Sequence, residues 1–168
     1  MTVIVIMGVS GSGKTTIGEL LGRRLGWEYA DADHFHPKAN IEKMAAGQPL
    51  TDVDRAPWLG AIAQWVTDHL EHGTPGVVSC SALRRRYRDQ VLLNGRPDVK
   101  GVYLDGDRDL IAERMRIRPG HFFKVEMLDT QFEALELPEP DEHILSVPVN
   151  GTPEETVELI LKGLDLNV

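Results

Sequence analysis

The sequence is poor in cysteine, in long hydrophobic runs and in positive charge. Cys80 is the single cysteine among 168 residues, which excludes an intramolecular disulfide and favours a reducing, cytoplasmic location. No apolar run reaches the length of a membrane span, and too few residues precede the first apolar run for a signal peptide, so we expect no contact with a membrane. The net charge of −8 argues against nucleic acid as a partner.

The hydrophobic pattern predicts an α/β fold with a three-layer sandwich. Segments with helical periodicity at 58–70, 110–115 and 154–164 alternate with five short apolar runs, at 3–7, 27–32, 76–80, 99–104 and 143–149. This alternation predicts a five-stranded parallel sheet with right-handed crossovers. The length suits one core, so we expect a single domain over 1–168.

A glycine-rich segment follows the first apolar run and precedes a helical one. It matches the P-loop pattern G-x-x-x-x-G-K-[ST] with Gly8, Val9, Ser10, Gly11, Ser12, Gly13, Lys14 and Thr15. Its glycines allow backbone N–H groups, including that of Thr16, to surround phosphate oxygens at a helix amino terminus. Lys14 would reach the β- and γ-phosphates, and the Thr15 hydroxyl would ligate Mg²⁺. The segment therefore predicts binding of a nucleoside triphosphate.

Two aspartates follow the second apolar run, where ligands bind in open α/β sheets. Asp31 and Asp33 are one residue apart and point to opposite faces of an extended segment, so they cannot share one role. We assign Asp31 to the Mg²⁺ shell and Asp33 to the acceptor hydroxyl. Either could instead cap a turn. With His34 and His36 they could also ligate a transition metal, although nothing else in the sequence completes a zinc site.

Basic residues cluster in two further places near the expected site. Arg55 precedes a proline and the helix expected from residue 58, where its guanidinium could bind a carboxylate on a small substrate. Four arginines follow the third apolar run, and of these we expect Arg84 and Arg88 at the substrate carboxylate or a subunit interface. The Ser81 hydroxyl could bond substrate hydroxyls. The alternatives are an exposed ion pair for Arg55 and a solvated basic face for the arginine cluster.

The segment 117–137 lacks a strand signal, and we expect it to cross the surface as a helical lid. Arg114 precedes this segment and Arg118 lies at its start; the two are one helical turn apart and can share a face. We place Arg118 at the transferring phosphates, where it would neutralise developing charge, and Arg114 beside the adenine. Surface ion pairs with Glu113 or Asp109 are the alternative for both arginines.

Together these motifs closely resemble the gluconokinases. Beyond the P-loop, the resemblance rests on Asp31-x-Asp33-x-x-His36-Pro37, Gly47-x-Pro49-Leu50-x-Asp52-x-Asp54-Arg55-x-Pro57-Trp58-Leu59, Ser79-Cys80-Ser81-Ala82-Leu83 and Gly120-His121-Phe122. It implies the P-loop NTPase fold of the shikimate kinase-like branch of the nucleoside monophosphate kinases. It also implies ATP-dependent phosphorylation of D-gluconate at its 6-hydroxyl, giving 6-phospho-D-gluconate, by a homodimer.

Under this resemblance ATP and Mg²⁺ are the cofactors, and D-gluconate lies between Asp33, Arg55 and the segment around Ser81. We expect His36, Lys38 and Arg84 to contact the same substrate. Shikimate kinase is the nearest alternative, but a Gly-Gly-Gly turn would be expected where this chain has Ser79-Cys80-Ser81. A nucleoside monophosphate kinase and a regulatory switch without an acceptor are further alternatives, and the aspartate pair disfavours the switch.

Overall fold

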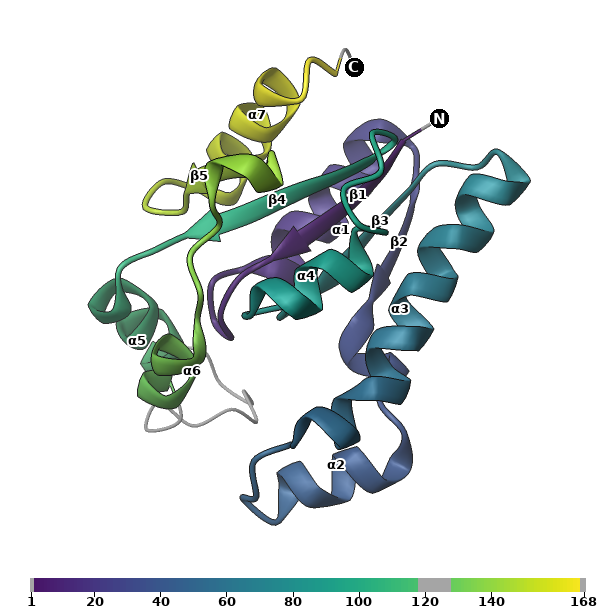
Figure 1. The fold of residues 1–168 in the computed structure, drawn as a ribbon. Coiled ribbons are helices and arrows are strands. Elements are labelled where there is room, and N and C mark those ends of the chain that lie inside the picture. The colour runs from purple at the N-terminus through teal and green to yellow at the C-terminus, as the bar shows by residue number, and fades with distance from the viewer. Residues whose placement is uncertain (1, 118–127, 167–168) are drawn as a thin grey trace.

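The computed structural model describes residues 2–117 and 128–166, which fold around a five-stranded parallel sheet (Figure 1). The strands follow the spatial order β2 (Glu28–Asp31), β3 (Gly76–Cys80), β1 (Val3–Met7), β4 (Val99–Asp105) and β5 (Leu145–Pro148). Each apolar run predicted from the sequence corresponds to one strand, and β4 extends one residue beyond its run. The predicted class of fold is confirmed, with β2 and β5 shorter than their apolar runs.

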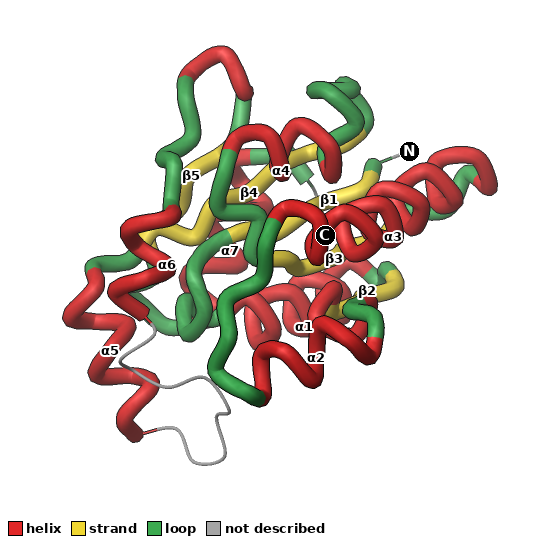
Figure 2. Tube along the Cα trace, turned by 60° about the horizontal axis from the view of Figure 1, so that its bottom comes forward, coloured by secondary structure: helices red, strands yellow, loops and turns green. Residues whose placement is uncertain are grey.

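Helices cover both faces of the sheet (Figure 2). Alternate residues of β1 point to opposite faces and so belong to two different hydrophobic cores. Val3 and Val5 belong to the core shared with α3 (Asp52–His72) and α4 (Arg85–Val91). Ile4 and Ile6 belong to the opposite core, shared with α1 (Lys14–Leu25) and α7 (Pro153–Gly163). Burial on both faces explains why the strands read as continuous apolar runs. None of the helices within 2–117 and 128–166 is long and apolar enough to cross a membrane.

The other helices lie beyond the carboxyl ends of the strands (Figures 1 and 2). A 3₁₀ turn, η1 (Ala32–Phe35), leads from β2 into α2 (Lys38–Ala45). On the other side α5 (Arg108–Ile117) packs against α6 (Leu128–Ala134). These two helices share a third apolar core with the phosphate loop, formed by Val9, Leu83, Ile111, Ala112, Met115 and Leu128.

A buried ion pair attaches α4 to a second 3₁₀ turn, η3 (Pro140–Glu142). The side chains of Arg88 and Glu142 are 2% and 3% exposed, and the guanidinium donates to both carboxylate oxygens at 2.8 and 3.1 Å. Its remaining nitrogen donates to the backbone carbonyls of Leu83 and Glu136. Burial raises the pKa of Glu142, but the hydrogen bonds that its carboxylate accepts outweigh burial and leave the pKa below its usual value. Arg88 is therefore a structural residue, and its expected place at the substrate or an interface is wrong.

Replacing Arg88 with methionine should lower the free energy of unfolding by about 3–5 kcal/mol, because Glu142 would stay buried without a counter-charge. Urea unfolding monitored by circular dichroism measures this loss. The matched control is Arg85→Gln on the same helix, where the ion pair with Asp141 is exposed and contributes little. A variant Arg88→Met that is as stable as Arg85→Gln would contradict the assignment.

Candidate active site

The loop between β1 and α1 is shaped to receive an anion. Gly11 and Gly13 have φ values of 81° and 97°, in the left-handed region that glycine adopts without strain. The Lys14 ammonium donates to the Val9 carbonyl at 3.0 Å and the Ser12 hydroxyl donates to the same oxygen at 2.7 Å, which closes the loop on itself. No side chain caps the amino end of α1, and its first turn, which lies wholly in the described part, has no acidic residue. The positive end of this helix therefore faces the loop.

Two aspartates lie within electrostatic reach of the loop lysine. Burial lowers the pKa of Lys14, while the negative charges of Asp33 and Asp31 act in the opposite direction. Cys80, at the end of β3, belongs to the same cluster, and burial raises its pKa to about 12. A lysine in such a setting gains from an anionic ligand, because phosphate oxygens replace the solvent that burial removes.

The region between the loop and β2 offers oxygen ligands that suit Mg²⁺. The Thr15 hydroxyl donates to Asp31 Oδ2 at 3.2 Å, and Asp31 Oδ1 accepts the backbone N–H of Asp33 at 2.9 Å. Asp31 thus caps the turn η1 and also faces the loop. Within the described ranges no group of three His, Cys, Asp or Glu side chains could hold a metal ion. A cation at Thr15 and Asp31 would complete its shell with phosphate oxygens and water, as Mg²⁺ does.

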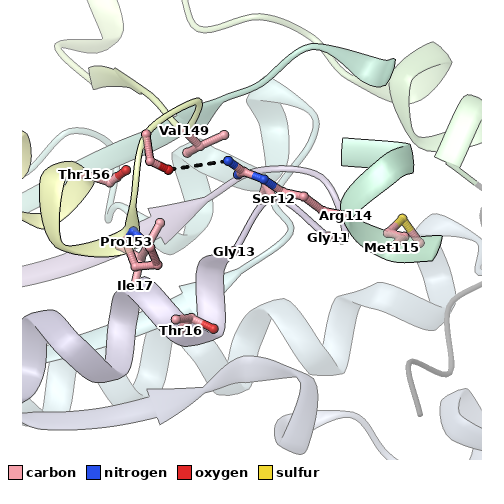
Figure 3. Close-up of a pocket in the computed structure, with 11 residues that line it drawn as sticks. Gly11, Ser12, Gly13, Thr16, Ile17, Arg114, Met115, Val149, Pro153 and Thr156 are labelled. Carbon is pink, nitrogen blue, oxygen red and sulfur yellow. Dashed lines mark hydrogen bonds between the residues drawn. The ribbon is translucent and has the colours of Figure 1, made fainter. Parts of the chain in front are cut away.

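A pocket of about 310 Å³ opens beside the phosphate loop (Figure 3). Arg114 and Met115 of α5 form one wall, and Arg114 donates to the Gly151 carbonyl at 3.4 Å. The other residues that line it are Gly11, Ser12, Gly13, Thr16, Ile17, Val149, Gly151, Pro153 and Thr156. Its size and its place next to the loop suit a nucleoside.

The acceptor side is organised around Trp58. Its indole Nε1 donates to the Ala32 carbonyl at 2.6 Å, which fastens the turn carrying Asp33 to α3. His36 stacks on the indole with ring centroids 4.3 Å apart. Burial, followed by the nearby Arg55 charge, lowers the pKa of His36 to about 4, so the imidazole is neutral at pH 7. His36 and Arg55 are thereby placed on the same side of the site as Asp33.

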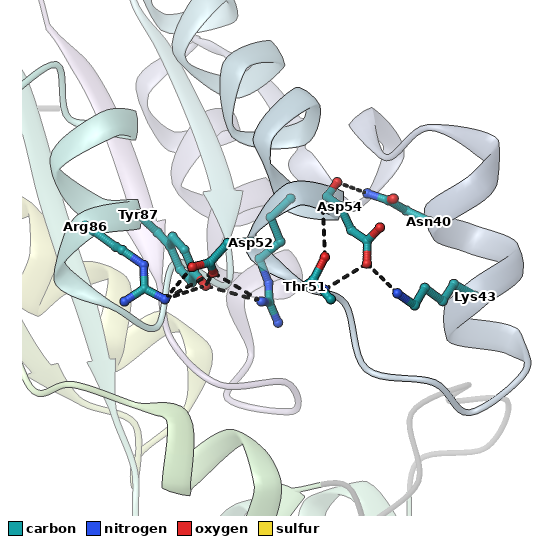
Figure 4. Close-up of polar contacts among 8 residues, drawn as sticks. Asn40, Lys43, Thr51, Asp52, Asp54, Arg86 and Tyr87 are labelled. Atoms are coloured by element: carbon teal, nitrogen blue, oxygen red, sulfur yellow. Dashed lines mark hydrogen bonds and ion pairs between the residues drawn. The ribbon is translucent and has the colours of Figure 1, made fainter.

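Helix α3 begins earlier than the sequence suggested, at Asp52 and not near Trp58. A capping box explains the early start: the Thr51 hydroxyl accepts the Asp54 N–H, and the Asp54 carboxylate accepts the Thr51 N–H. Lys43 of α2 also donates to Asp54 at 2.6 Å and ties the two helices together (Figure 4). Arg55 therefore stands in the first turn of α3, with Pro57 inside the helix.

The remaining substrate candidates differ in how they are placed. Ser81 and Arg84 are half-buried between β3 and α4, and the side chain of Arg84 makes no hydrogen bond or ion pair within 2–117 and 128–166. Lys38 begins α2 with a side chain 90% exposed, its ammonium 3.9 Å from Glu42. The structure thus holds Arg84 close to the end of β3 and leaves Lys38 facing solvent. Arg118 lies outside the described residues.

Two elements of this site were not predicted from the sequence. Val149 and Gly151 of the loop after β5, with Pro153 and Thr156 of α7, complete the pocket beside the phosphate loop, which only the rule that ligands bind at the carboxyl ends of strands could have indicated. Gln131 of α6 accepts the backbone N–H of Ser10 at 2.6 Å and so attaches α6 to the phosphate loop. A pairing across 121 residues has no local signal.

Comparison with known proteins agrees with the motifs. A family model described as shikimate kinase matches residues 10–139. The thermoresistant gluconokinase of Escherichia coli (strain K12) is 43% identical over 166 residues, which cover 96% of this chain and 94% of that protein. The gluconokinase of Gluconobacter oxydans (strain 621H) is 41% identical over 159 residues, or 95% and 89% of the two chains. A crystal structure of a gluconokinase from Sinorhizobium meliloti 1021 has a TM-score of 0.88 at 42% identity and covers 98% and 91%.

Substitution of Arg114 by alanine should raise the Kd for ATP about tenfold, because the nucleoside pocket loses its cationic wall. Isothermal titration with a non-hydrolysable ATP analogue measures the change. Arg116→Ala serves as the matched control, since Arg116 is exposed on the same helix and pairs with Glu113. Equal affinities for the two variants would remove Arg114 from the nucleotide site.

Proposed function

The chain belongs to the gluconokinase family, within the shikimate kinase-like P-loop kinases, and on this premise we propose which of its residues carry out the family's reaction. The reaction is the ATP-dependent phosphorylation of D-gluconate to 6-phospho-D-gluconate. Identity above 40% with gluconokinases over nearly the whole chain is the observation that carries this conclusion. The assignment of individual residues is our proposal.

ATP binds with its phosphates on the loop from Gly8 to Thr16 and its nucleoside in the pocket beside Arg114. Lys14 turns from the Val9 carbonyl to the phosphates, where its ammonium stabilises negative charge on the β- and γ-phosphate oxygens. The low dielectric that lowers the Lys14 pKa also strengthens this attraction once a phosphate is present. Arg118, at the start of the proposed lid at 117–137, adds charge at the transferring group when water is excluded.

Mg²⁺ fits the oxygen pair of Thr15 and Asp31, which would hold it beside the phosphates. When bound, the ion neutralises charge on the phosphate oxygens. Asp31 needs no rearrangement to face it, because the backbone N–H of Asp33 already orients the carboxylate. Tyr29 and Ser79 share a hydrogen bond of 2.6 Å between their hydroxyls, across β2 and β3 beneath this position.

D-Gluconate lies between the turn that carries Asp33 and the first turns of α3 and α4. Asp33 orients the 6-hydroxyl and accepts its proton as the hydroxyl oxygen attacks the γ-phosphorus and the bond to the β-phosphate oxygen breaks. Arg55 binds the carboxylate at the other end of the substrate. Ser81, Arg84, His36 and Lys38 contact the polyol chain.

We also propose an oligomeric state and a cellular location. The protein acts as a homodimer, like the family that its motifs resemble, and it works in the cytoplasm. ATP is available there, and a thiol such as Cys80 stays reduced.

An ADP-release assay across acceptors tests the activity. We expect release with D-gluconate and background rates with shikimate or nucleoside monophosphates. Shikimate is the important comparison because the matching family model carries that name. Preference for shikimate would overturn the assigned substrate, and equal release without any acceptor would point to a nucleotide switch.

Replacing Asp33 with asparagine should lower kcat at least about a hundredfold, since the amide cannot take up the hydroxyl proton. ATP affinity should stay close to that of the wild type, which titration with the ATP analogue checks. Turnover near the wild-type rate would exclude Asp33 as the proton acceptor.

A further inference from the structure

Four polar side chains meet where the first turn of α3 faces the first turn of α4 (Figure 4). Asp52 and Arg55 come from α3, and Arg86 and Tyr87 come from α4. The Tyr87 hydroxyl donates to Asp52 and accepts from Arg55 Nη1 at 3.2 Å. Arg86 Nη2 donates to both Asp52 oxygens, at 2.8 and 3.1 Å. Asp52, Arg86 and Tyr87 therefore lie around Arg55, to which we assign the binding of the substrate carboxylate.

Tyr87 holds the Arg55 guanidinium in place. Its side chain is buried, with 6% of the residue exposed, so its ring position is set by the core between α3 and α4. The Arg55 guanidinium lies 5.4 Å from the ring centroid, and that of Arg86 lies 5.0 Å from it. One hydroxyl hydrogen bond and one cation–π contact thus restrain an otherwise flexible side chain.

The two carboxylates in the first turn of α3, those of Asp52 and Asp54, form ion pairs with cations from other helices. Hydrogen bonds from Tyr87 and Arg86 lower the pKa of Asp52, and the hydrogen bond from Lys43 of α2 lowers that of Asp54 to about 2, so both are ionised at neutral pH. Arg86 engages Asp52 at 2.8 Å, whereas Arg55 Nη1 is 4.0 Å from the same carboxylate. The Arg55 charge is therefore left available in a strongly acidic protein.

We propose that Arg86 and Tyr87 are positioning residues that keep Arg55 available for the substrate carboxylate. Arg86 forms an ion pair with Asp52, so that this carboxylate does not pair with Arg55. Tyr87 restrains the Arg55 guanidinium through the hydrogen bond to its hydroxyl. This inference rests on the proposed role of Arg55 in binding gluconate. If Arg86 were absent, Asp52 would pair with Arg55, which is already within 4.0 Å, and would compete with the substrate.

The test is a pair of single variants and their combination, measured by steady-state kinetics. Arg86→Gln should raise the gluconate KM about tenfold, with kcat and the ATP KM unchanged, because only uniform binding of the acceptor is weakened. Adding Asp52→Asn to Arg86→Gln removes the competing carboxylate and should return the gluconate KM to within about twofold of wild type. Asp52→Asn alone should not raise it.

A direct contact of Arg86 with gluconate predicts the opposite for the double variant, whose KM would stay as high as that of Arg86→Gln. That result would overturn the inference. Arg24→Gln is the matched control for loss of one surface cation, because Arg24 pairs with Glu158 between α1 and α7. Its gluconate KM should equal that of the wild type.

Tyr87→Phe tests the second half of the proposal independently of charge. It keeps the ring in the core and removes only the hydroxyl, so we expect a several-fold higher gluconate KM at unchanged kcat. An unchanged KM would overturn the role of the hydroxyl. Arg55→Ala separates this inference from the proposed function: a wild-type gluconate KM in Arg55→Ala would refute the role of Arg55 itself, whereas a raised KM beside an unaffected Arg86→Gln would refute only the inference.

Discussion

Strands β1 and β3 pair in parallel from Val3 opposite Gly76 to Met7 opposite Cys80, and β4 pairs with the other edge of β1. Both faces of this centre are buried, so polar groups can gather only where the strands end. All strands run in one direction, which brings the phosphate loop, the turn after β2 and the start of α4 to a single edge. The relative positions of these three elements therefore follow from strand pairing. Side chains refine an arrangement that the sheet has already fixed.

Local signals in the sequence were sufficient for the parts of the protein that depend on neighbouring residues. The apolar runs predicted the five strands, and the glycine-rich segment located the phosphate loop, because both patterns express constraints within a few residues. The start of α3 was also within reach, since Thr51 and Asp54 have the spacing of a capping box. The expected start at Trp58 followed the helical periodicity that begins there and overlooked this cap.

Partnerships between distant residues could not be predicted in this way. An arginine in a basic cluster looks the same whether it faces solvent, substrate or a buried glutamate. The fate of Arg88 depends on Glu142, 54 residues later, and only the folded chain brings them together. The residues after β5 that line the pocket beside the phosphate loop likewise carry no local sequence signal of that position. The net charge of −8 also gave no indication of how charges are paired locally. Ion pairs between helices, Lys43 with Asp54 and Arg86 with Asp52, occupy these carboxylates and leave other cations available for a ligand.

Cys80 is the last residue of β3, within electrostatic reach of the phosphate-loop lysine, where it is buried and its thiol resists ionisation. Thiol-specific reagents and oxidants react with the thiolate form of cysteine. The single cysteine of the folded protein therefore reacts slowly with them. The thiol becomes reactive when β3 leaves its neighbours, which requires the core of the sheet to open. The rate at which Cys80 is labelled therefore reports how often the core of the sheet opens, and how far bound ATP slows that opening.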